Sequence, residues 1–165
     1  MYPNTKKAII LAIILIIPTV SFAKNHKPIS KETENVCLAK ALYYEARGEP
    51  ELGKKAVAKI VLNRKNHKKF PKTICKVINQ VNYIKGRKLC QFSWVCNRQR
   101  IDTASDSWEQ AKFLSSSILS NKTKLPNFAS NVLFFKSVHS KQRFGKGYRF
   151  VSRVGKSNFY SKNIS

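Results

Sequence analysis

The chain has 165 residues, a length that suits one ordinary domain with a short additional segment and leaves no room for a second large one. It carries 32 Lys and Arg residues against 8 Asp and Glu, a formal net charge of +24 at pH 7. This charge favours an anionic polymer as the partner but does not choose among nucleic acid, anionic membrane and anionic cell-wall glycan.

The first residues are typical of an export signal. A positively charged start precedes an uninterrupted apolar run over residues 8–17, and the small-residue site Ser21-Phe22-Ala23 follows. We therefore expect a signal peptide over residues 1–23. The alternative is an uncleaved anchor, but the run is well short of the roughly 20 apolar residues that cross a bilayer. Export favours a periplasmic or extracellular location and argues against nucleic acid as the partner.

The cysteines agree with export. An even number of cysteines in an exported chain predicts two disulfides, with three pairings open among Cys37, Cys75, Cys90 and Cys96. A zinc site is disfavoured because no Cys-x-x-Cys pair exists and the three histidines are scattered. We expect no metal and no cofactor.

Helices dominate the first part of the expected domain. A polar leader over residues 24–32 precedes a domain over residues 33–165. Helical spacing of apolar residues predicts a helix over 36–46, with Ser30 or Thr33 as its cap and Gly48 as a left-handed C-cap. Pro50 opens a second helix. Its apolar stripe comprises Leu52, Ala56, Val57, Ile60 and Val61.

The remaining elements become shorter and then turn to strands. Phe70-Pro71 introduces a short helix with an apolar side, and the polar stretch 82–88 predicts a loop. A further helix over about 105–119 buries Trp108, Ala111, Ile118 and either Leu114 or Ser115. Segments 132–135, 148–151 and 158–160 are aromatic or β-branched and predict a small antiparallel sheet. The expected fold is one α+β domain, helices first.

Acidic residues are rare enough to weigh singly. Six stand at or near predicted helix starts, where the helix dipole favours a negative charge, and need no functional explanation: Glu32, Glu34, Glu51, Asp102, Asp106 and Glu109. Glu45 differs because it ends its helix and follows the pair Tyr43-Tyr44, and both features raise a carboxyl pKa. A carboxyl group that keeps its proton can act as the general acid of glycoside cleavage. An ion pair with Arg47 or with a lysine of the second helix explains Glu45 equally well.

Glu49 is open to two interpretations. It is either a second carboxylate of a catalytic site or a cap for the second helix, and the cap is favoured. A retaining or inverting hydrolase needs two carboxyl groups around the scissile bond. A lytic transglycosylase needs one, because the 6-hydroxyl of muramic acid attacks within the same sugar. The scarcity of acids therefore favours transglycosylation.

The segment Gln91-Phe92-Ser93-Trp94 combines an amide, a hydroxyl and two aromatic faces, which suits sugar binding. A bridge between Cys90 and Cys96 would stiffen it. The alternative is that Phe92 and Trp94 are ordinary core residues.

Several separated blocks carry a family resemblance: residues 44–50, Gly53, residues 56–58, Asn63-Arg64, Phe70-Pro71 and residues 91–93. From about residue 36 to 160 the chain resembles the cell-wall hydrolase family typified by the spore cortex-lytic enzymes SleB and CwlJ. The resemblance implies a monomeric, lysozyme-like catalytic domain that cleaves peptidoglycan between N-acetylmuramic acid and N-acetylglucosamine as a lytic transglycosylase.

The same resemblance assigns the catalytic acid, which falls on Glu45. Apart from the resemblance, we expect substrate binding at Glu49, Gln91, Phe92, Ser93 and Trp94. Two departures stand near the end of the chain, where Lys136 and Ser157 occupy positions at which relatives often carry histidine. Any role of those histidines does not transfer. A non-catalytic cationic protein that binds wall or membrane remains the alternative from another class.

Overall fold

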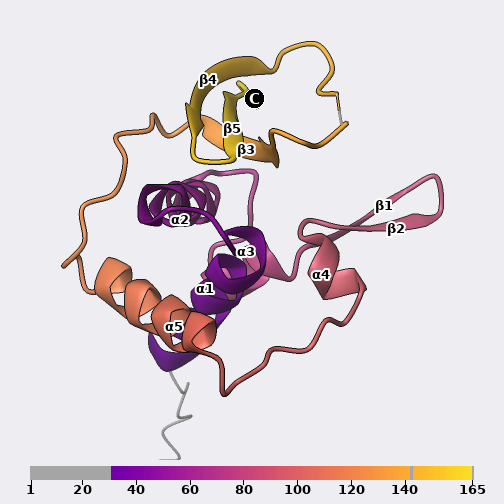
Figure 1. Ribbon diagram of the computed structural model, residues 1–165. Coiled ribbons are helices and arrows are strands. Elements are labelled where there is room, and N and C mark those ends of the chain that lie inside the picture. The colour runs from indigo at the N-terminus through magenta and orange to yellow at the C-terminus, as the bar shows by residue number, and fades with distance from the viewer. Residues whose placement is uncertain (1–30, 142, 165) are drawn as a thin grey trace, which may run out of the picture.

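The computed structural model describes residues 31–141 and 143–164, in which helices come first and a small antiparallel sheet comes last (Figure 1). The predicted α+β class is thus confirmed. The expected signal peptide and residues 24–30 of the leader lie outside the described residues. The elements are α1 (Lys31–Glu45), α2 (Glu51–Asn66), α3 (Ile74–Ile78), β1 (Val81–Ile84), β2 (Arg87–Cys90), α4 (Ser93–Cys96), α5 (Asp106–Leu119), β3 (Val132–Ser137), β4 (Arg149–Val154) and β5 (Ser157–Ser161).

Helix α1 forms the centre of the helical part and contacts α2, α3 and α5 (Figure 1). Its residues Leu38 and Leu42 are fully buried, and each such side chain contributes about 1.5–3 kcal/mol by leaving water. The Cys37–Cys75 disulfide fastens α1 to α3. The carboxylate of Glu34 also accepts a hydrogen bond from the backbone N–H of Ile74, at the start of α3. Glu34 therefore has a structural role.

The boundaries of the first two helices differ in part from the prediction. Helix α1 begins at Lys31, so Thr33 lies inside it and is not its cap. Gly48 has φ +77°, which confirms the predicted left-handed position after the helix. In α2 the predicted stripe is buried except for Leu52, which is 57% exposed because it lies in the first turn, where no other element covers it. No helix in the described ranges is long and apolar enough to cross a membrane.

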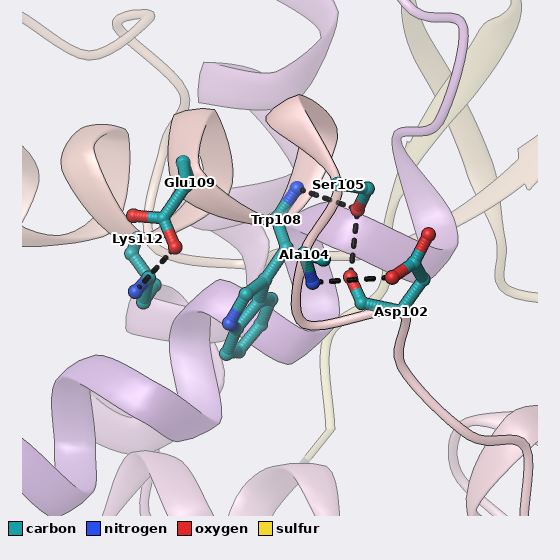
Figure 2. Close-up of polar contacts among 6 residues, drawn as sticks. All are labelled: Asp102, Ala104, Ser105, Trp108, Glu109 and Lys112. Atoms are coloured by element: carbon teal, nitrogen blue, oxygen red, sulfur yellow. Dashed lines mark hydrogen bonds and ion pairs between the residues drawn. The ribbon is translucent and has the colours of Figure 1, made fainter.

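Figure 2 shows how the start of α5 is fixed. The hydroxyl oxygen of Ser105 accepts from the backbone N–H of Trp108 at 3.3 Å, and the Asp102 carboxylate accepts from the backbone N–H of Ala104 at 3.1 Å. Glu109 pairs with Lys112 on the exposed side. The acids in this region act as helix-start and surface groups, as predicted. Ser115, rather than the half-buried Leu114, occupies the buried position.

The C-terminal sheet has the order β3-β5-β4 with antiparallel pairing. Helix α2 packs against β3 (Figure 1). A small apolar cluster of Ala56, Ile60, Val132 and Phe159 fills this interface. The side-chain amide of Asn63 donates to the carbonyl oxygens of Ala129 and Val132 at 2.9 and 3.0 Å, which fixes where β3 begins.

The prediction of a loop over residues 82–88 is wrong, because these residues belong to a hairpin of β1 and β2. Its turn residues Lys85 and Gly86 both have positive φ, 49° and 75°, as a two-residue hairpin turn of the primed type requires. Residues 82–89 are exposed, so the strands lack the apolar alternation that would have revealed them. The hairpin projects from the body of the molecule (Figure 1).

Candidate active site

A cleft of about 470 Å³ lies between the C-terminal end of α1, the end of β3 and the base of the β1–β2 hairpin. Helices α1 and α2, the base of the hairpin, the segment before α4 and the end of β3 all contribute to it. The lining residues are Glu45, Arg64, Asn82, Leu89, Cys90, Gln91, Phe92, Ser93, Phe135, Lys136, Ser137 and Ser140. Among these residues, Glu45 is the only carboxylic acid.

Glu45 is the last residue of α1, so its carboxyl group lies at the negative end of the helix dipole. Burial raises the pKa of Glu45 above its ordinary value. Two neighbours lower this pKa in part, the indole N–H of Trp94 first and the positive charge on Arg64 second. The net result is a carboxyl group that holds its proton to higher pH than a free glutamate and that faces a cleft. This combination suits a general acid.

Arg64 is a buried cation beside the acid. Its side chain is 3% exposed, and its Nε donates to the carbonyl oxygen of Leu133 at 2.7 Å. Burial lowers the pKa of Arg64 to about 10, so the guanidinium remains charged at neutral pH. The amide oxygen of Gln91, turned toward the guanidinium, accepts from both of its terminal nitrogens at 3.2 Å. Arg64 is thus held in place and supplies a fixed positive charge near Glu45.

Aromatic rings surround the same guanidinium. Its central carbon lies 5.6 Å from the ring centre of Phe92, 5.7 Å from that of Phe70 and 5.8 Å from that of Phe134. Cation–π contacts of this kind stabilise a desolvated arginine. No role was predicted for Arg64 from the sequence, although this residue continues the apolar stripe of α2 one turn beyond Ile60 and Val61. A cation on a buried stripe is the signal that could have identified it.

Trp94 lies close enough to Glu45 to affect its pKa, but it is outside the lining of the cleft and lines a separate hollow with Tyr44. Its ring is 7% exposed and stacks on the ring of Tyr44, with 4.6 Å between centres. The Tyr44 hydroxyl donates to the carbonyl oxygen of Gln99 at 2.9 Å, which fixes the stack. Within the described part of the chain the Trp94 indole N–H makes no hydrogen bond of ordinary geometry, so it lowers the pKa of Glu45 as an oriented dipole rather than through a formed bond.

The structure brings Gln91, Phe92 and Ser93 into the cleft beside Glu45. The disulfide between Cys90 and Cys96 closes this segment, and Ser93 begins the short helix α4. Phe92 is only 2% exposed, so it supports the cleft from below rather than offering an open ring face. Ser93 is exposed and available to a ligand.

Glu49 lies outside the lining of the cleft. Its two carboxylate oxygens accept from the backbone N–H of Lys156 at 2.8 Å and from the hydroxyl of Ser157 at 3.0 Å. The cap position of α2 is taken by Pro50 without a side-chain hydrogen bond, so the capping interpretation is wrong. Glu49 instead ties the start of α2 to the turn between β4 and β5. Of the two residues that stand where relatives often carry histidine, Ser157 donates a hydrogen bond to Glu49, and Lys136 lines the cleft.

Two glycines make room for the Glu49 side chain. A Cβ atom on Gly53 would lie 2.7 Å from the carboxylate, and one on Gly155 would collide with the same carboxylate. Gly155 also has φ +58°, a conformation that glycine adopts without strain. We call the arrangement of Glu49 with Lys156, Ser157 and these glycines the carboxylate clamp.

The profile of the cell wall hydrolase family matches residues 48–160. The spore cortex-lytic enzyme of Bacillus cereus is 39% identical over 66 residues, which cover 34% of this chain and 26% of the relative. The enzyme of the same name from Halalkalibacterium halodurans is 51% identical over 41 residues, covering 25% and 12%. The chain thus matches about a quarter or less of the length of these curated relatives.

Two solved structures are similar over most of the chain. One is the catalytic domain of the germination-specific lytic transglycosylase SleB from Bacillus anthracis, with a TM-score of 0.58, 24% identity and coverage of 82% of this chain and 98% of that one. The other is the catalytic domain of the Bacillus cereus SleB protein, with a TM-score of 0.55, 25% identity and coverage of 81% and 94%.

Proposed function

The chain belongs to the cell wall hydrolase family, and from this premise we propose that it cleaves peptidoglycan glycan strands as a lytic transglycosylase with Glu45 as its acid/base. The bond cleaved would join N-acetylmuramic acid to N-acetylglucosamine. The observation that carries the proposal is the single carboxyl group in the cleft, with a raised pKa.

The reaction uses one carboxyl group twice. The protonated Glu45 donates its proton to the glycosidic oxygen as the bond to C1 of muramic acid breaks. The resulting carboxylate then takes the proton of the 6-hydroxyl as that oxygen attacks C1 of the same sugar. A 1,6-anhydro ring forms, Glu45 is protonated again, and no water is consumed.

The surroundings of Glu45 support both halves of this cycle. Burial favours the protonated form that begins the reaction, and the fixed charge of Arg64 limits the cost of the carboxylate form that follows. Glu49 does not serve as a second carboxylate in this proposal because the clamp occupies both of its oxygens. A general base for water is therefore absent from the described lining of the cleft.

Gln91 and Ser93 would bind the sugar next to the scissile bond, since both line the cleft beside Glu45. Phe92 would act indirectly by shaping the floor of the cleft, and Trp94, which lies outside its lining, would act through the pKa of Glu45. Loss of residues 1–23 would remove only Lys6 and Lys7, so the exported enzyme would keep 30 basic against 8 acidic residues, a formal charge of +22 that would hold it on an anionic wall or outer-membrane polymer. We propose a periplasmic or extracellular location because the sequence predicts an export signal over residues 1–23. We also propose that the enzyme is a monomer.

Mass spectrometry of soluble products tests the proposal. The full chain, the Glu45→Gln variant and a matched Glu109→Gln control are each incubated with purified peptidoglycan. Glu109 is a suitable control because its carboxylate pairs with Lys112 on the surface of α5 (Figure 2). Wild type and control should release anhydro-muropeptides, and Glu45→Gln should release none.

Other products would point elsewhere. Reducing muropeptides, heavier by one water, would show hydrolysis and a second carboxyl group in action. Equal clearing of the wall by wild type and Glu45→Gln would favour a cationic protein that binds without catalysis, and that effect should weaken with added salt.

A further inference from the structure

The β1–β2 hairpin has two chemically different faces. Residues paired across antiparallel strands point to the same side, and successive residues alternate. The pairs Asn82 with Leu89 and Ile84 with Arg87 therefore share one face, which we call the inner face. Tyr83 and Lys88 form a pair on the opposite face.

The inner face continues the candidate active site. Asn82 and Leu89 line the cleft that contains Glu45. Leu89 also lines a second hollow of about 660 Å³, together with Ile84 and Arg87. Lys85 and Lys88 border this hollow as well. The two hollows therefore share the Leu89 side chain, and they follow one another from the acid outward along the hairpin; we call this succession the track.

The outer hollow of the track combines apolar contact with positive charge, and no carboxylate is among its lining residues. Ile84 is 57% exposed and Leu89 53%, so both offer apolar surface to a partner along the hairpin. Ile84 lies two residues beyond Asn82, which lines the cleft, so the hairpin extends the track beyond the cleft by about 7 Å at about 3.3 Å per residue. That length exceeds one sugar ring.

We propose that the inner face of the hairpin binds the same glycan strand beyond the sugars held in the cleft, with Arg87 contacting a carboxylate of a stem peptide. This inference rests on the proposed function, because it places the strand in the cleft first. A muramic acid carries its peptide on the side of the ring, and such peptides end in carboxylates. A guanidinium binds a carboxylate through two parallel hydrogen bonds.

An anionic membrane fits the hairpin less well. A bilayer surface is broad, whereas the apolar side chains divide between the two faces, with Tyr83 on one and Ile84 and Leu89 on the other. The inner face is also concave and opens into the cleft. A narrow polymer that already occupies the cleft is the better match.

The test compares two double variants of the full chain. Ile84→Ser/Arg87→Gln alters the inner face. Tyr83→Ser/Lys124→Gln is the control, since it removes one exposed large side chain of the same hairpin and one exposed cation beyond α5, and neither residue lines either hollow. Three substrates are used: glycan strands with stem peptides, the same strands after an amidase has removed the peptides, and a tetrasaccharide short enough to fill the cleft alone.

The inner-face variant should raise KM on peptide-bearing strands about tenfold, which corresponds to about 1.4 kcal/mol, with kcat unchanged. Its defect should be smaller on peptide-free strands and absent on the tetrasaccharide. The control should match wild type on all three.

Several results would overturn the inference. The first is equal behaviour of the two double variants, and the second is an inner-face variant whose defect is the same on strands with and without peptides. The third is an inner-face variant that no longer binds vesicles of anionic phospholipid but digests all strands at the wild-type rate. If wild type yields no product from any of the substrates, the proposed function itself fails and the inference fails with it.

Discussion

Replacing Glu49 by alanine distinguishes a structural carboxylate from a catalytic one. The carboxylate clamp joins two parts of the chain that lie more than a hundred residues apart, through one backbone N–H and one hydroxyl. Hydrogen bonds to a charged partner contribute about 1.5–3 kcal/mol each. Alanine removes both and leaves one buried and one partly buried donor unpaired, but water can enter the vacated space and recover part of the loss. We therefore expect Glu49→Ala to lower the free energy of unfolding by about 3 kcal/mol.

Glutamine at the same position should cost less. Its amide oxygen can still accept from the Lys156 N–H, and its amide N–H can donate to the Ser157 oxygen, so we expect a loss of about 1 kcal/mol. Chemical denaturation measures both values, and each 1 kcal/mol should lower Tm by about 2–4 °C in a domain of this size. Folded Glu49→Gln should keep most of its activity on peptidoglycan.

A double-mutant cycle tests the packing part of the argument. Gly155→Ala introduces a Cβ that collides with the Glu49 carboxylate and lies 3.0 Å from the ring of Pro50. Combining it with Glu49→Ala removes the first collision, so the two losses should add to more than the double variant shows. A structural role for the Glu49 carboxylate is contradicted if Glu49→Ala has the same free energy of unfolding as wild type, or if Glu49→Gln folds normally yet forms no product. The second result would identify Glu49 as the missing carboxylate of a hydrolase.

Three further outcomes are expected. Because burial raises the pKa of Glu45, the folded state keeps this proton at pH values where the unfolded state has lost it, and stability falls as pH rises from the unfolded to the folded pKa. The Tm of Glu45→Gln should therefore rise relative to that of wild type as pH increases. A Tm difference that stays constant with pH in thermal melts would contradict this. Trp94→Phe keeps the stack on Tyr44 but removes the N–H that lowers the pKa of Glu45, so the alkaline limb of the kcat profile should move to higher pH; movement to lower pH would reject it. Replacing Cys37 and Cys75 by alanine should cost about 4 kcal/mol, given a separation of 38 residues, as measured by denaturation under oxidising conditions; a loss below about 1 kcal/mol would show that this bond is not a major constraint.

Local patterns were sufficient for most of the fold. The helix that ends at Glu45, the left-handed turn at Gly48 and the three closing strands follow from apolar spacing and turn residues, which act within a few positions. The β1–β2 hairpin was missed for the same reason, since its residues are exposed and lack an apolar period. Its only local sign was Lys85-Gly86, and a lysine seldom takes a positive φ.

The site was predictable where a residue's position alone determines its chemistry. Glu45 stands out because a helix C-terminus and neighbouring rings act on any carboxyl group placed there. The partners of Glu49 and Arg64 could not be foreseen, because Ser157 and Leu133 reach them only through tertiary folding. A sequence pattern shows that a charged residue occupies a buried face, but not which distant donor or acceptor compensates it.

The two disulfides also bear on how a producing cell would survive such an enzyme. Both bonds need oxidising surroundings, and in a reducing cytoplasm the four sulfurs remain thiols. One bond fastens the central helix and the other closes the segment beside the acid, so under the proposed export the newly made chain would lack both restraints until it left the cytoplasm. Compartment chemistry would then provide a safeguard, because the cleft would become rigid only on the side of the membrane where the proposed substrate is present.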